Sequence, residues 1–131
     1  MRVTLTRACS LLCAAVLAAA LLAGCADGSN EIKTFPYVPG DNFTTNVYGE
    51  ARLMLRSEVV IDVLDQKHIA KLEEKEYVVR HTITRFLSEQ NKETLNAAGA
   101  MEALGDALKD EINIALGQDY VYKIYLSYFM A

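Results

Sequence analysis

The sequence predicts one small α+β domain that follows an apolar N-terminal segment. Apolar residues recur at every second position between residues 52 and 64, with Ser57 as the one interruption on that face, and recur at helical spacing over two later stretches, while residues 120–130 are dense in β-forming residues. The chain has 131 residues, is 52% hydrophobic and has a formal charge of −4, which fits one folded domain and excludes a disordered chain. We therefore expect the order ββααβ, with two long helices on one face of a small antiparallel sheet.

The first 24 residues are typical of an export signal. Arg2 and Arg7 precede a short Ala-rich apolar core. Leu22-Ala23-Gly24 then leads into Cys25, which resembles the lipobox of bacterial lipoproteins. That resemblance implies cleavage before Cys25 and a lipid on its thiol. The alternative is an uncleaved transmembrane helix, because the apolar stretch approaches the roughly 20 residues that span a membrane. Both alternatives tether the domain to a membrane, on its extracytoplasmic or periplasmic side.

Cysteine positions and charge limit the chemistry of the rest of the chain. Cys9, Cys13 and Cys25 are the only cysteines, so residues 26–131 can form neither a disulfide nor a cysteine-based zinc site. Residues 25–131 hold 11 basic and 17 acidic residues, a charge of −6. This acidic balance argues against nucleic acid as a partner and against wide contact with anionic lipid headgroups.

The first half of the domain is predicted from turn signals and alternation. Residues 25–41 are rich in Gly, Ser, Asn and Pro, which favours a tether followed by a loop. The domain proper is expected over residues 42–131. A strand over residues 42–48 is followed by a turn at Gly49-Glu50. The strand over residues 52–64 is unusually long, so we expect a bend or bulge within it. Its expected inner face consists of Leu53, Leu55, Ser57, Val59, Ile61 and Val63.

Two long helices and a last strand follow. Asp65 is a plausible N-cap for a helix that continues to about residue 88. A second helix begins near Gly99 and should stop at Gly117. Its expected apolar stripe is Met101, Leu104, Leu108, Ile112, Ala115 and Leu116, and its expected outer face is Glu102, Asp106, Lys109, Asp110 and Asn113. The strand over residues 120–130 is apolar on both faces, which favours a central strand or a face reserved for a partner.

No residue pattern predicts catalysis. His68 and His81 lie on opposite sides of the first helix and cannot share a metal ion. The sequence lacks a Ser-His-Asp pattern with elbow glycines, a phosphate-binding Gly-rich loop and an HExxH motif. Glu76 lies near the apolar stripe of its helix, where its stem should pack while its carboxylate reaches water. We expect a protein that is not an enzyme and holds neither metal nor cofactor.

The order of several short motifs resembles the FliL family of flagellar basal-body-associated proteins. The resemblance covers about residues 35–130. Single motifs are weak, and the specificity lies in their order and spacing. The matching segments are Asn42-Phe43-Thr44-Thr45-Asn46-Val47, Arg52-Leu53-Met54-Leu55, Leu72-Glu73-Glu74-Lys75, Val79-Arg80, Phe86-Leu87-Ser88, Glu111-Ile112-Asn113 and the closing Val121–Phe129. The sequence departs from the family pattern in its lipobox, where a transmembrane helix is usual, and at Leu55, where Lys is frequent.

This resemblance implies a non-enzymatic scaffold with a fold similar to the stomatin-like (SPFH) domain. Such a scaffold forms a homo-oligomeric ring around flagellar stator units at the basal body and supports torque and motility. An oligomeric envelope lipoprotein unrelated to flagella is the alternative. A third alternative, a lipoprotein that delivers a small ligand to a transporter, is disfavoured because the domain is too small for a two-lobed cleft.

Two aromatic residues are the candidate partner contacts. Tyr125 and Phe129 lie on the face of the last strand opposite Ile124 and Leu126. Helices cover only one side of a single sheet, so these rings remain available unless residues 35–41 form a second layer. Exposed aromatic side chains that form a patch mark a protein contact.

Overall fold

The computed structural model describes residues 31–131. Residues Lys33–Ala131 form one compact unit. The expected signal over residues 1–24 and the expected lipidation site at Cys25 lie outside the described residues, so both remain predictions.

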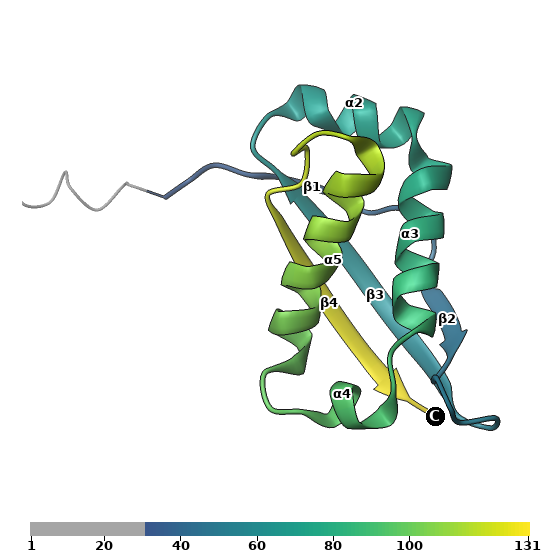
Figure 1. The fold of residues 1–131 in the computed structure, drawn as a ribbon. Helices are drawn as coiled ribbons and strands as arrows, with labels where there is room; N and C mark the ends of the chain where they lie inside the picture. Colours follow the sequence, from purple (N-terminus) through teal and green to yellow (C-terminus); the bar gives the residue numbers. More distant parts are fainter. Residues whose placement is uncertain (1–30) are drawn as a thin grey trace, which may run out of the picture. The chain divides into compact units, whose positions relative to one another are not determined.

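A four-stranded antiparallel sheet is built around one long strand (Figure 1). The strands are β1 (Phe35–Tyr37), β2 (Phe43–Asn46), β3 (Met54–Val63) and β4 (Lys123–Met130). β4 pairs with β3 from Leu55 to Asp62 and therefore occupies one whole edge of it. β1 and β2 pair with opposite ends of β3, so together they form the other edge.

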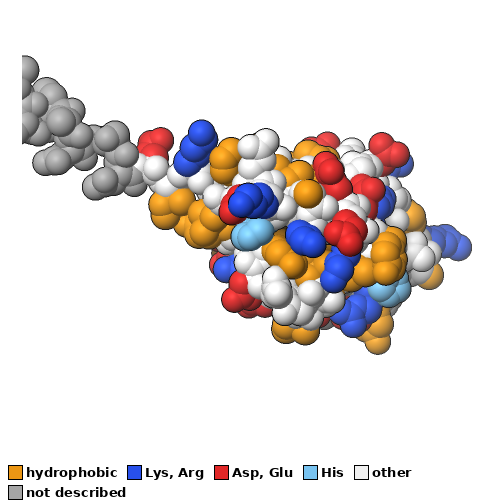
Figure 2. Space-filling model, turned by 90° about the horizontal axis from the view of Figure 1, so that it is seen from above, with side chains coloured by type: hydrophobic (Ala, Val, Ile, Leu, Met, Phe, Trp, Pro, Cys, Tyr) orange, Lys and Arg blue, Asp and Glu red, His pale blue; other side chains and the backbone are white. Residues whose placement is uncertain are grey.

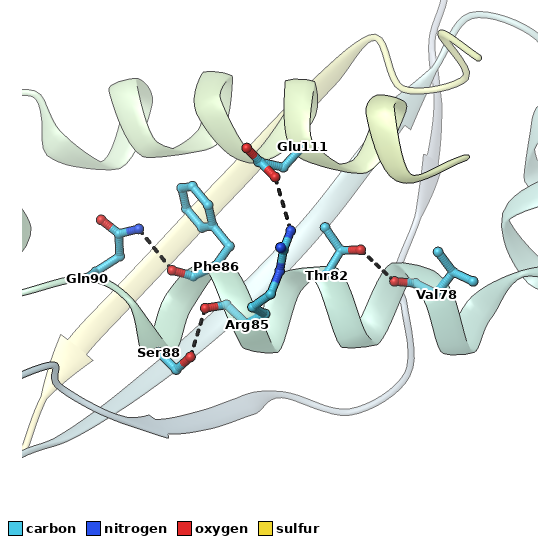
Figure 3. A network of polar contacts seen from close by, with 7 residues as sticks. All are labelled: Val78, Thr82, Arg85, Phe86, Ser88, Gln90 and Glu111. Carbon is cyan, nitrogen blue, oxygen red and sulfur yellow. Dashed lines mark hydrogen bonds and ion pairs between the residues drawn. The ribbon is translucent and has the colours of Figure 1, made fainter. Parts of the chain in front are cut away.

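Four helices lie on one side of this sheet, in agreement with the predicted α+β class (Figure 1). They are α2 (Gln66–Glu74), α3 (Glu76–Ser88), α4 (Lys92–Asn96) and α5 (Ala100–Leu116). α3 and α5 lie side by side and are joined by an ion pair between Arg85 and Glu111, whose side-chain atoms are 3.1 Å apart (Figure 3). The ion pair is half-exposed, so it contributes less to stability than the apolar contacts beneath it.

The core lies between the helices and the inner face of the sheet. The predicted alternation in β3 is confirmed from Met54 to Val59, where Leu55 and Val59 are buried while Arg56 and Glu58 are exposed; residues 61–63 are all buried, although the alternation places Asp62 on the outer face. The helices contribute six fully buried side chains, which are Leu72, Val79, Ile83, Leu87, Leu108 and Ile112. Burial of each such side chain contributes about 1.5–3 kcal/mol, and this core holds the domain together without a disulfide.

The described elements differ from the expected ones in three places. Phe35–Tyr37, within the expected loop, pairs with β3 as β1. The expected first helix is divided at Lys75, where the backbone leaves helical geometry. Neither Pro nor Gly stands there; the division lets α2 contact β1 while α3 turns to run along β2 and α5. The expected bulge in β3 is wrong, because its register with β4 is unbroken over eight pairs.

The helix ends lie where the capping residues predicted them, whereas two residues of α5 lie on the opposite side from the one predicted. Asp65 caps α2 by accepting a hydrogen bond from the Lys67 N–H, and Gly117 ends α5 in the left-handed conformation. Asn113, expected to face water, is buried, and its side-chain amide bonds both the N–H and the carbonyl of Val121. Met101, expected in the core, is exposed because α5 begins beside the sheet and not above it (Figure 1).

Candidate functional site

One face of the sheet is left uncovered by every described element, and we call it the open face. It consists of the accessible outward side chains of β2, β3 and β4: Thr44, Asn46, Met54, Arg56, Glu58, Val60, Lys123, Tyr125, Ser127 and Phe129. Residues 35–41 do not form a second layer, because β1 joins the edge of the sheet. The open face therefore leaves Tyr125 and Phe129 accessible without a packing partner among the described residues.

The two candidate contact residues, Tyr125 and Phe129, both lie on the open face. The Tyr125 side chain is 52% exposed and the Phe129 side chain is 58% exposed. Tyr125 is directly opposite Val60 on β3, and Phe129 is opposite Arg56. The ammonium nitrogen of Lys123 lies 5.0 Å from the centre of the Tyr125 ring, close enough for a cation–π contact. The rings are thus displayed on a rigid sheet, with charged groups around them.

The last strand is an edge strand of the sheet, and β3 takes the central place. The sequence left open whether the strand over residues 120–130 is central or offers a face to a partner. Its apolar residues on both faces are now explained: Ile124 and Leu126 pack into the core, while Tyr125 and Phe129 stay on the open face.

The two histidines occupy separate positions. His81 is exposed on α3. His68 lies on α2 beside a polar hollow of about 320 Å³, and its ring packs edge-on against Tyr120 with 5.2 Å between the ring centres. Across residues 31–131, no three His, Cys, Asp or Glu side chains gather closely enough to hold a metal ion.

A half-buried polar cluster connects the segment after β1 with α3 on the covered side of the sheet. The Arg80 guanidinium donates hydrogen bonds to the backbone carbonyls of Pro39 and Asp41 and lies 4.5 Å from the Phe43 ring centre. Burial, together with the neighbouring Glu76 and Glu73 carboxylates, raises the pKa of Tyr37 to about 12. These contacts fasten the segment between β1 and β2 onto α3.

Charge is mixed at the end of the domain where α2 lies. Figure 2 shows basic, acidic and hydrophobic side chains interspersed there, without a continuous basic patch on that view. No helix within residues 31–131 is both long and apolar enough to cross a membrane.

The sequence did not predict two features of the domain around β4. One is the groove between β4 and the beginning of α5, where Met101 and Glu102 line the wall. The other is the Asn113 clamp that fixes the start of β4. Helical spacing places Met101 on the same stripe as Leu108, so the sequence alone does not indicate that Met101 lines the groove.

The fold and the open face define a small α+β domain whose distinctive surface is suited to contact with proteins. Comparison with known families then gives a specific result: residues 37–131 match the family described as flagellar basal body-associated protein FliL. The chain belongs to the FliL family, as the motif order predicted. This is a structural family associated with the flagellar basal body, and it is not a known enzyme family. A search of curated proteins finds no match to the chain.

Proposed function

We propose that this protein is a membrane-tethered scaffold of the flagellar motor that self-associates around stator units and supports torque. The family match supports the basal-body part of this proposal. The lipobox-like Leu22-Ala23-Gly24-Cys25 supports a lipid tether that holds the domain at the extracytoplasmic or periplasmic side of a membrane.

The single observation that carries the assembly part is the exposure of Tyr125 and Phe129 on an uncovered sheet face. Large aromatic side chains provide much of the energy in protein interfaces because they bury a large area with few rotatable bonds. Arg56 and Glu58 lie on the central strand β3, opposite Phe129 and Ser127, so a partner that covers the two rings must also pair both charges.

The size of the open face favours assembly on the membrane over assembly in free solution. Three strands across and eight residues along give a footprint of ~400 Å². A stable pairwise interface buries about 800 Å² on each partner. A tether compensates for the smaller area, because confinement to one membrane raises the effective concentration of the copies.

An oligomeric envelope lipoprotein unrelated to flagella is the second candidate, and the same fold, tether and open face would serve it. The two candidates differ in the partner only. Loss of the gene impairs motility under the first proposal and leaves it unchanged under the second.

The test combines a deletion strain with two complementing variants of the full chain. Tyr125→Ser with Phe129→Ser should lower swimming speed under viscous load and weaken crosslinking between copies. The matched control is Tyr48→Ser with Tyr77→Ser, which removes two aromatic side chains that are 66% and 77% exposed but lie off the open face. Normal assembly and normal speed of the Tyr125/Phe129 variant at high load would remove the open face from the mechanism.

A further inference from the structure

The two edges of the sheet differ in how well they are protected against pairing with another strand. The edge formed by β1 and β2 is interrupted between Tyr37 and Phe43, and Pro36 in the middle of β1 has no N–H to donate. Both features are common protections of an edge. β4 runs for eight residues without a proline, and no strand within residues 31–131 pairs with its outer side.

The hydrogen-bond register shows which backbone groups of β4 point away from the sheet. Met54 and Ala131 exchange both of their backbone hydrogen bonds, each 2.9 Å long. Because such pairs recur at every second residue of an antiparallel ladder, Ser127 bonds to β3, whereas Leu126 and Tyr128 direct their N–H and carbonyl groups outward. The Ile124 carbonyl belongs to the outward set and lies beneath Gly105 of α5.

The beginning of α5 forms a wall beside this free edge. Met101 and Glu102 line a groove of about 400 Å³ together with β4 residues 123–127 and with Glu58 and Val60 of β3. Figure 1 shows that α5 crosses the N-terminal half of β4. The first turns of α5 lie to the outer side of the strand. A single extended segment in the groove would bond to β4 and pack beneath Met101. A second copy joined edge to edge by a two-fold axis would bring its own α5 into the same space.

The charged residues around the groove indicate which kind of extended segment would bind there. Glu102 lies on its wall and Glu58 on its floor, and Asp106 stands one helical turn after Glu102 on the same face of α5. Lys123 is the single basic residue that lines the groove, and its ammonium group lies over the Tyr125 ring. We propose that the free edge of β4 and the first turns of α5 bind an extended segment of a partner protein in which apolar residues alternate with lysine or arginine. This inference goes beyond the proposed scaffold role, because it concerns backbone pairing with the strand edge, although the groove shares Glu58, Val60, Lys123, Tyr125 and Ser127 with the open face.

The test measures backbone hydrogen exchange in the full chain in detergent. The probe is a peptide of about nine residues in which Val and Lys alternate, close to the length of β4. One control peptide has Glu in place of Lys, and another has Pro at two of the Val positions, which prevents strand pairing. The Val–Lys peptide should slow exchange of the Leu126 and Tyr128 amides, while the Ser127 amide, already bonded to β3, changes little.

Charge-reversal variants test the wall of the groove. Glu102→Lys and Asp106→Lys should each weaken binding of the Val–Lys peptide roughly two- to fivefold, the range expected for exposed charge pairs. Glu89→Lys, at the far end of α3, is the matched control and should bind as the unchanged chain does. Unchanged exchange at Leu126 and Tyr128 with saturating peptide would overturn the proposal. Equal binding of the Lys, Glu and Pro peptides would overturn it as well.

Discussion

Replacement of Gly105 by alanine tests how closely α5 packs against the sheet. A Cβ atom at this position would lie 2.9 Å from the carbonyl oxygen of Ile124, about 0.5 Å closer than ordinary contact. That oxygen belongs to a strand held by β3, so α5 itself must move. Alanine gains about 1 kcal/mol over glycine inside a helix, whereas overpacking of a fitted core costs about 1–3 kcal/mol. We expect a net loss of about 1 kcal/mol in the free energy of unfolding.

Urea unfolding of residues 30–131, followed by circular dichroism, measures this change. The matched control is Ala107→Gly on the exposed face of the same helix, where the loss of helix propensity alone should cost about 1 kcal/mol. If propensity governed both positions, Gly105→Ala would stabilise the domain by about the amount that Ala107→Gly destabilises it. Stabilisation by Gly105→Ala would therefore refute the close approach of α5 to β4.

Three further substitutions test the core, the clamp and the buried tyrosine by the same unfolding assay. Leu108→Ala should lower the free energy of unfolding by ~2–5 kcal/mol because Leu108 is fully buried. Asp106→Ala should change it by no more than about 0.5 kcal/mol. Equal effects would contradict the orientation of α5, in which Leu108 faces the core. Asn113→Ala should cost about 1–3 kcal/mol because it leaves both backbone groups of Val121 buried without partners, and a neutral result would contradict the clamp. The folded pKa of Tyr37 lies above its unfolded value near 10, so this residue contributes stability below pH 10 that is lost as the pH rises to about 12. Tyr37→Phe should flatten the loss over that window, and an unchanged alkaline loss would contradict this.

Periodicity in the sequence predicted most of the fold, because alternation and helical spacing record which side chains meet the core. Alternation predicted the inner face of β3. Single residues predicted the N-cap at Asp65 and the end of α5 at Gly117. It did not predict the division at Lys75, since no Pro or Gly marks it and the division depends on packing against distant strands.

The candidate site was predicted only in part, for a related reason. The exposure of Tyr125 and Phe129 follows from alternation along one strand together with a single helical layer. The groove beside β4 depends on the tilt of α5, and the burial of Asn113 depends on where the loop before β4 returns. The spacing of apolar residues predicts neither the tilt of α5 nor the path of that loop, because both depend on contacts between distant parts of the chain.

The position of the full chain in living cells tests the central proposal most directly. A fluorescent fusion of the full chain should form foci that coincide with flagellar basal bodies and vanish in a strain that lacks them. The Tyr125→Ser, Phe129→Ser variant should lose these foci, while the Tyr48→Ser, Tyr77→Ser control keeps them. Foci that persist without basal bodies, or an even distribution around cells with normal motors, would contradict a role in the flagellar motor.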